Sequence, residues 1–195
     1  MQSKKVILKS ILSYQGLTSG YSFRGKIKHI HNGGVRVIQL KDFEDNYTYI
    51  GNDCYLVDSD MIKSKYYLES GDILFTGKGT NNFAIVFKST EDTPTIASSA
   101  LFVIKVDQNI ANPNYVAWYI NQSKVQNYFK TNEAGTYNTS INKTTLEETP
   151  ITLPSLEVQT KIARIANLHN QELALSNKIR ELKNKLTTTQ LLNVL

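Results

Sequence analysis

The sequence of 195 residues contains a single cysteine, Cys54, so an internal disulfide is excluded and no cluster of thiolate metal ligands is available. No apolar run approaches the ~20 residues that a membrane-spanning helix needs. The N-terminal segment also lacks the apolar core of a secretory signal peptide. These absences predict a cytoplasmic protein with no membrane partner. Its 41% of hydrophobic residues is enough to build a globular core.

Sequence motifs for catalysis are missing as well. The glycines around Lys78 in FTGKGTNN, residues 75–82, lack the spacing of a Walker loop or of a dinucleotide fingerprint. His29 and His31 have no carboxylate or thiol ligand nearby in the sequence, and no Ser-His-Asp arrangement is indicated. We therefore predict a protein that is not an enzyme and that holds no metal or cofactor. An enzyme whose site is too dispersed to detect is the alternative.

Acidic residues are absent from the start of the chain, where residues 1–36 carry seven basic residues and the first acid is Asp42. The net charge of the chain is +5, so the remainder carries a small negative excess. A basic segment of this kind favours a polyanion, because each phosphate that it neutralises releases condensed counterions. The alternative is a solvated basic face with no partner. The residues expected to contact DNA in this segment are Arg24, Lys26, Lys28 and Arg36.

Two polar loops supply further candidates for DNA contacts. In the loop after residue 76, Lys78 can contact phosphate or guanine, and Asn81 and Asn82 can pair with adenine. In the polar stretch 134–143, amide and hydroxyl side chains can contact phosphates and bases. The alternatives are an ordinary turn between strands and a solvated connector. The candidates in the second stretch are Tyr137, Asn138 and Lys143.

The order of the sequence patterns predicts an α+β (mixed α/β) globular domain over residues 1–154. Alternating apolar residues predict strands at 35–40, 73–76, 82–89 and 95–106, with another strand around 26–30. Residues 6–14 fit a short helix or an irregular start, and the prolines around 149–154 favour a short extended segment. A helix is expected over 112–130, with Asn112 as N-cap and Pro113 in the first turn.

The last segment, residues 155–195, predicts a long coiled-coil helix with Ser155 as its N-cap. Its apolar stripe alternates steps of four and three residues, as the seam of a coiled coil does. Roughly 38 helical residues would extend about 55 Å, whereas a compact domain of about 150 residues is only ~30 Å across. The helix should therefore project and pair with a partner, unless it breaks near 167–170 into a hairpin. The expected interface residues are Leu168, Leu175, Ile179, Leu182 and Leu186.

Several stretches together resemble the specificity subunits of type I restriction-modification systems. They are GYSFRGKIKHIHNGGVRVIQLKDF (20–43), LESGDILFTGKGTNNFAIVF (68–87), YVAWYINQSKVQNYF (115–129), AGTYNTSINKTTLEETPITLPSLEVQTKIARI (134–165) and the closing heptads. They occur in the order found in that family and cover nearly the whole chain. The most specific pieces are the Gly-Thr loop, the Leu-Glu-Glu at 146–148 and the segment that opens the long helix.

The resemblance implies a target recognition domain that reads one half of a double-stranded DNA site, followed by a spacer helix. Usual members carry this unit twice, with the two helices antiparallel, and they dock methyltransferase subunits that restriction subunits join later. S-adenosylmethionine, magnesium and ATP would bind those partner subunits only. This sequence contains one unit, as in a half-length form, so the resemblance implies a homodimer. The rival hypothesis is a coiled-coil scaffold or inhibitor that pairs with other specificity subunits without binding DNA.

Overall fold

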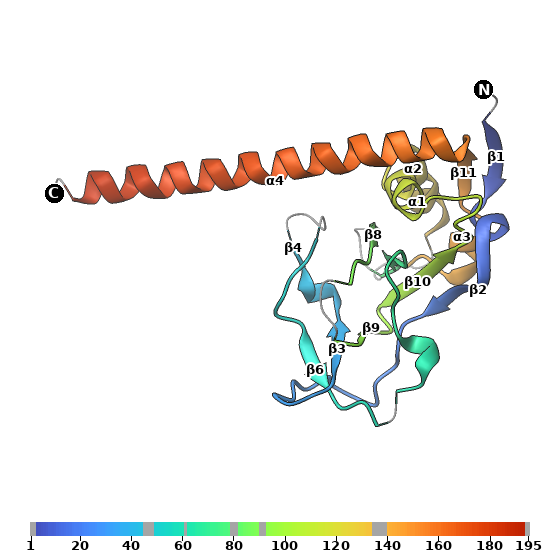
Figure 1. Ribbon diagram of the computed structural model, residues 1–195, viewed down its shortest axis with the longest axis horizontal. Coiled ribbons are helices and arrows are strands. Elements are labelled where there is room, and N and C mark those ends of the chain that lie inside the picture. The colour runs from blue at the N-terminus through green and yellow to red at the C-terminus, as the bar shows by residue number, and fades with distance from the viewer. Residues whose placement is uncertain are drawn as a thin grey trace.

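The computed structural model describes residues 3–44, 49–60, 62–78, 82–89, 93–133 and 140–193. An α+β body is followed by helix α4, Leu156–Leu192, which leaves the top of the body and projects far beyond it (Figure 1). The predicted α+β class and the long C-terminal helix are therefore confirmed. Within the described ranges, no helix is both long enough and apolar enough to cross a membrane.

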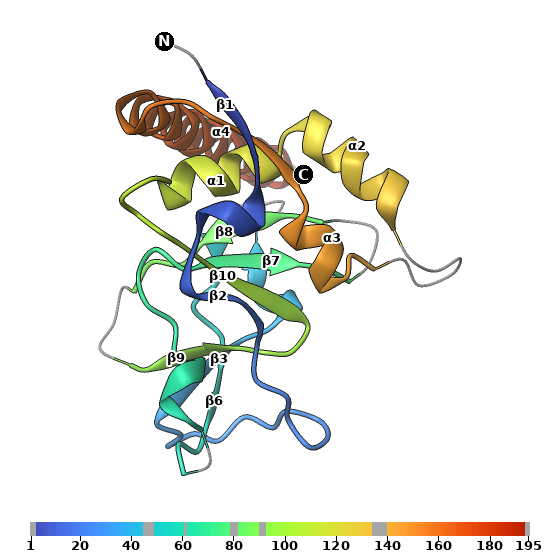
Figure 2. The ribbon, with the colours of Figure 1, turned by 90° about the vertical axis from the view of Figure 1, so that its right-hand side faces the viewer.

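The upper part of the body is an antiparallel sheet with the strand order β2–β10–β7–β8. The strands are β2 (Leu12–Ser19), β10 (Leu101–Val106), β7 (Ile73–Thr76) and β8 (Ala84–Val86). Helices α1 (Pro113–Ile120) and α2 (Ser123–Asn132) lie on the side of the sheet toward α4, and α3 (Lys143–Glu147) lies beside the sheet (Figure 2). The rings of Phe75 on β7 and Phe129 on α2 are fully buried and pack together, with 5.2 Å between their centroids. This burial of apolar rings joins the layers.

The lower part of the body holds a second sheet, in which β3 (Val35–Ile38) lies between β6 (Tyr55–Val57) and β9 (Thr95–Ala97). Strand β3 runs antiparallel to β6 and parallel to β9. A small hairpin of β4 (Phe43–Glu44) and β5 (Tyr49–Ile50) and the short 3-10 helices η2 (Leu40–Asp42) and η3 (Ser64–Tyr66) complete this part. Its small core is built on β-branched side chains, as the pattern VRVI predicts.

The start of the chain differs from the sequence prediction. Residues 6–14 do not form one short helix, because β1 (Lys4–Ile7) is followed by the single 3-10 turn η1 (Leu8–Ile11) and then by β2. Strand β1 pairs antiparallel with β11 (Pro150–Leu153), the segment just before α4. This ribbon fixes the first residues of the chain beside the start of the long helix.

Three other sequence predictions need correction. Residues 26–30 form no strand, although Ile30 N–H donates one hydrogen bond to the carbonyl of Leu56 at 2.9 Å. The expected strand 95–106 is two strands, β9 and β10, which belong to different sheets. The expected helix 112–130 is two helices, because the chain turns between α1 and α2. At that turn the Asn121 amide bonds both the N–H and the carbonyl of Ala84, each at 2.8 Å.

The beginning of α4 is fixed to the body through a buried amide. Gln159 is only 1% exposed, and its Oε1 accepts a hydrogen bond from Asn112 N–H at 2.8 Å. Its Nε2 donates to the carbonyls of Ile110 (3.1 Å) and Pro154 (2.9 Å). Farther along, α4 continues without interruption, so the alternative of a hairpin near residues 167–170 is wrong.

Candidate nucleic-acid interface

The part of the basic N-terminal segment that carries Arg24, Lys26 and Lys28 is an irregular loop at the lower end of the body (Figure 1). Arg24, Lys26 and Lys28 are all exposed in it. The loop is tied to β6 at His29, whose Nδ1 accepts a hydrogen bond from Leu56 N–H at 3.1 Å. These three cations can therefore reach a phosphate backbone without the cost of exposing buried surface.

Arg36 lies in a different environment from the other three bases. It belongs to the central strand β3 and is half-buried, and its Nη2 donates to the carbonyl of Gly51 at 2.7 Å. Its Nε atom has no hydrogen-bond partner in the part of the chain that the structure describes. Close by, burial raises the pKa of the Cys54 thiol, which therefore stays protonated and weakly nucleophilic. Arg36 is thus partly structural, and its role toward DNA stays a prediction.

The described ends of the two polar stretches predicted from the sequence contact each other. Lys78 forms an isolated antiparallel bridge with Ser140, and Ile141 N–H donates to the carbonyl of Gly77 at 2.7 Å. Gly77 is required at this contact, because a Cβ atom there would lie 2.7 Å from the ring of Phe102 and 2.9 Å from the carbonyl of Ile141. The loop contacts therefore bring Lys78 next to the second polar stretch.

The remaining candidates in these loops divide into two groups. Lys143 is exposed at the start of α3 and makes a loose ion pair with Glu147 at 3.7 Å, a contact that a phosphate can replace. Asn81, Tyr137 and Asn138 lie outside the described residues. Their proposed roles therefore stay predictions.

A groove lies between the body and the first half of α4, with a volume of about 910 Å³. Two predicted site residues, Arg36 and Asn82, line it. Asn82 is only 7% exposed, and its Oδ1 has no hydrogen-bond partner among the described residues. The described residues that line the groove form no recognisable catalytic arrangement. No group of three or more potential metal ligands is found in the ranges that the structure describes.

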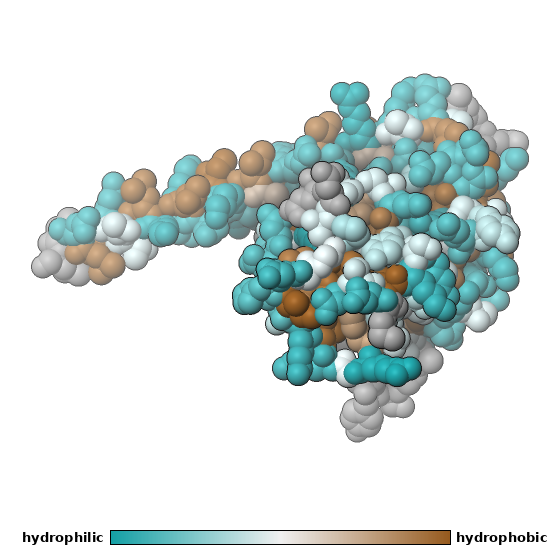
Figure 3. Space-filling model, turned by 60° about the horizontal axis from the view of Figure 1, so that its bottom comes forward, coloured by the Kyte–Doolittle hydropathy of each residue, from teal (hydrophilic) through white to brown (hydrophobic). Residues whose placement is uncertain are grey.

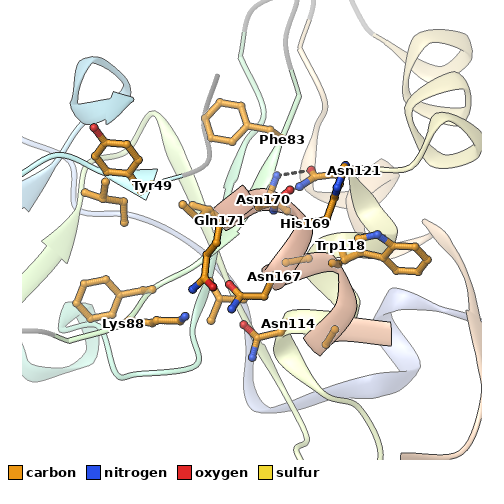
Figure 4. Close-up of a pocket in the computed structure, with 18 of the residues that line it drawn as sticks. Tyr49, Phe83, Lys88, Asn114, Trp118, Asn121, Asn167, His169, Asn170 and Gln171 are labelled. Carbon is orange, nitrogen blue, oxygen red and sulfur yellow. Dashed lines mark hydrogen bonds between the residues drawn. The ribbon is translucent and has the colours of Figure 1, made fainter. Parts of the chain in front are cut away.

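The groove is rich in amides that were not predicted as site residues from the sequence. Asn114 of α1 and Asn121, which follows α1, face the α4 amides across it, and Lys88 lies at its edge (Figure 4). The α4 amides are Asn167, Asn170 and Gln171. No aspartate or glutamate is among the described residues that line it. The spacing of the three α4 amides, i, i+3 and i+4, places them on one face of the helix. The sequence shows this spacing, but it does not show which part of the body lies opposite that face of the helix.

Beyond the body, α4 exposes the apolar stripe that the sequence predicts. Figure 3 shows hydrophobic side chains along the projecting part of the helix. The five predicted interface residues are between 53% and 66% exposed. Large aliphatic side chains at coiled-coil spacing are therefore left in water in the single chain. They are Leu168, Leu175, Ile179, Leu182 and Leu186.

The comparisons with known proteins agree with this arrangement. The chain matches the family model of the type I restriction modification DNA specificity domain over residues 5–184. No curated protein sequence matches it significantly.

Three solved structures share its fold. The S subunit of a type I restriction-modification system from M. genitalium is 14% identical, with a TM-score of 0.61 over 95% of this chain and 43% of that one. The HsdS subunit from Thermoanaerobacter tengcongensis is 14% identical, with a TM-score of 0.63 over 91% and 44%. A structure described by complex assembly and conformational transition of the type I R-M system is 13% identical, with a TM-score of 0.64 over 90% and 44%.

This chain spans less than half the length of each of those three structures. At these identities the likeness shows the fold, namely a body of this kind followed by a long helix. The family itself is shown by the model match, which covers nearly all of the described body and most of α4. The chain belongs to the family of type I restriction modification DNA specificity domains.

Proposed function

We propose that this chain is a DNA-recognition module of a cytoplasmic type I restriction-modification complex and does no catalysis itself. Its body reads one half of a bipartite DNA site, and α4 pairs antiparallel with α4 of a second copy. Methyltransferase subunits dock on this dimer and restriction subunits join them. S-adenosylmethionine, magnesium and ATP bind those partner subunits only.

The observation that carries this proposal is the combination of a family match over residues 5–184 with an unpaired helix. The described body carries a basic loop and two polar stretches whose described ends are in contact, and these suit phosphate and base contacts. The exposed apolar stripe on α4 would be buried by a partner surface of the same length and apolar character. The α4 of a second copy has both, and two identical seams can cover each other about a two-fold axis.

A titration of duplex DNA at several salt concentrations, with the cognate methyltransferase subunit present, tests the proposal. A DNA reader loses affinity steeply as salt rises, because phosphate contacts release counterions. Selection of bound duplexes from a random pool should then yield two identical inverted half-sites separated by unread base pairs. A complex that assembles with the methyltransferase but selects no sequence would instead identify a scaffold or inhibitor.

A further inference from the structure

The basic loop at the lower end of the body is packed onto the lower core and does not hang free. Its apolar side chains Phe23 and Ile27 are half-buried against that core, whereas the three basic side chains between and after them are exposed. The loop therefore has one face toward the core and one toward solvent. Because the loop is ordered before any ligand arrives, a contact made by its exposed face costs less conformational entropy.

His29 joins the end of this loop to the open edge of strand β6. Since β6 pairs with a strand on one side only, the backbone groups of Leu56 are available to the loop. The carbonyl of Leu56 accepts a hydrogen bond from Ile30 N–H at 2.9 Å, and Leu56 N–H donates to His29 Nδ1 at 3.1 Å. A ring nitrogen that accepts a hydrogen bond carries no proton, so the proton of this neutral imidazole is on Nε2.

Strand β6 also holds a cation beside this imidazole. The centroids of the His29 and Tyr55 rings are 5.5 Å apart, and Lys41 Nζ lies 3.2 Å from the centroid of the Tyr55 ring. The face of an aromatic ring attracts a cation without neutralising its charge. Both His29 and Lys41 are exposed, and no described residue accepts a hydrogen bond from His29 Nε2. A neutral N–H donor and a charged donor are thus held against one ring.

The carboxylates near this pair of donors do not occupy it. Asp42 is buried, and its Oδ2 accepts a hydrogen bond from Gln39 N–H at 2.7 Å. Asp53 and Asp58, at the two ends of β6, are exposed, and neither makes an ion pair with Lys41 within the described ranges. The two donors are therefore free to bind an anion that offers several acceptor oxygens.

A phosphate of a nucleic-acid backbone fits these donors better than a free anion does. A free anion would use the pair alone, whereas the same loop carries three further exposed cations, as contact with a polyanion requires. Phosphates line the outside of a duplex, so exposed side chains reach them without entering a groove of the DNA. Phosphate contacts of this kind set the position of a protein on the duplex and carry no sequence information.

We propose that His29 Nε2 and Lys41 Nζ bind one phosphate of the DNA half-site and thereby position the body on the duplex. The inference rests on the proposed function, and it assigns a positioning contact to two residues outside the predicted DNA-binding set. The two donors should differ in one measurable respect. Lys41 neutralises the phosphate and releases a counterion, whereas the neutral His29 ring does not.

The test measures binding of a labelled duplex that carries the selected half-sites to the full chain with its methyltransferase subunit, at several salt concentrations. His29→Asn retains an oxygen near the place of Nδ1, which can accept from Leu56 N–H, but it has no donor at the place of Nε2. Affinity should fall about tenfold for all sequences, with the salt slope and the stability to urea unchanged. Lys41→Gln should also weaken binding and should reduce the salt slope by about one unit.

Two further comparisons separate a shared phosphate from a merely structural role. If both donors bind one phosphate, the double variant should lose less affinity than the product of the two single losses. His29→Gln can place a donor near Nε2 but loses the bond to Leu56, so it should unfold at lower urea and bind DNA better than His29→Asn. The matched controls are His169→Asn and Lys183→Gln, exposed residues of α4 that should leave affinity and salt slope unchanged.

Four results would overturn the inference, and they can be told apart. Unchanged affinity of His29→Asn, in a complex whose unmodified form selects a half-site, would remove this contact alone. A changed preference at one base position would make His29 a base-reading residue. Losses that multiply in the double variant would place the two donors on separate phosphates. Failure of the unmodified complex to bind DNA would remove the proposed function and this inference with it.

Discussion

Replacing one leucine of the α4 stripe by aspartate should separate the proposed dimer into monomers. The five interface residues are 53–66% exposed in the single chain. Full burial of an exposed aliphatic side chain contributes ~1.5–3 kcal/mol, so covering a half-exposed one contributes about 0.8–1.5 kcal/mol. Ten such side chains across two copies give roughly 8–15 kcal/mol, against an association cost of about 4–15 kcal/mol. The dimer is therefore expected to be sensitive to single changes.

Leu182→Asp removes two of these burials per dimer and places two carboxylates in the seam. The missing burial alone is about 1.6–3 kcal/mol, which lowers affinity ~15–150-fold, and desolvation of the charges should lower it further. Sedimentation of the full chain over a range of concentrations measures the change. Leu173→Asp is the matched control, because Leu173 is a 49% exposed leucine on the same helix but off the stripe.

Two outcomes would refute this reasoning about the dimer. An unmodified chain that sediments as a monomer at tens of micromolar would remove the homodimer. Equal effects of Leu182→Asp and Leu173→Asp would show that association does not use the stripe. The direction of pairing is tested separately by Leu186→Cys, which lies away from the centre of an antiparallel pair. It should cross-link to itself only in a parallel pair, because disulfide formation requires Cα atoms within about 7 Å.

Two further predictions concern the anchor of α4 and the contacts to phosphate. Gln159→Ala removes a buried amide that makes three hydrogen bonds to the backbone, and it should lower the free energy of unfolding by about 2–4 kcal/mol in urea denaturation, whereas the exposed Gln190→Ala should leave it nearly unchanged. The variant Lys28→Ala/Lys78→Ala/Lys143→Ala should weaken binding to all DNA sequences and reduce the salt slope by about one unit for each phosphate that is no longer neutralised. Unchanged binding would place the phosphate-binding residues elsewhere.

Local patterns in the sequence predict the elements that depend on local chemistry. Strand β7 spans the predicted Ile73–Thr76, and α1 begins after the predicted N-cap, where the Asn112 side chain accepts from the N–H groups of Asn114 and Tyr115. The alternating steps of four and three residues predict both the length of α4 and its exposed stripe. Each of these signals is contained within a few turns or strand residues.

The parts that were missed depend on contacts between distant segments. Strand β1 is defined by its pairing with β11, which lies more than 140 residues later in the sequence, and no local pattern indicates that partner. The sequence of residues 112–130 predicts one helix. The turn that divides it is accompanied by a hydrogen bond between Asn121 and Ala84, which are far apart in the sequence, so no local pattern indicates the turn. The groove was missed for the same reason. Its amides on α4 share a helical face in the sequence, but the opposite wall comes from α1 and the segment after β8.

If the paired α4 helices hold the two bodies apart, helix length should set the unread spacer of the DNA target. Inserting seven residues between Leu175 and Ile179, with apolar residues at the stripe positions, keeps the seam in phase and adds ~10 Å. At ~3.4 Å per base pair, the preferred spacer should lengthen by about three base pairs. The half-sites themselves should not change, since the bodies that read them are untouched.

The same insertion also changes the angular relation of the half-sites. Three added base pairs rotate one half-site by ~100° about the duplex, so the DNA or the bodies must twist and some affinity should be lost. Selection from a random duplex pool with the methyltransferase subunit present measures spacer and half-sites together. A consensus without inverted symmetry would exclude the homodimer. An inverted repeat whose spacer ignores the insertion would keep the dimer but show that α4 does not set the distance, because the bodies would then be positioned by the methyltransferase subunits instead.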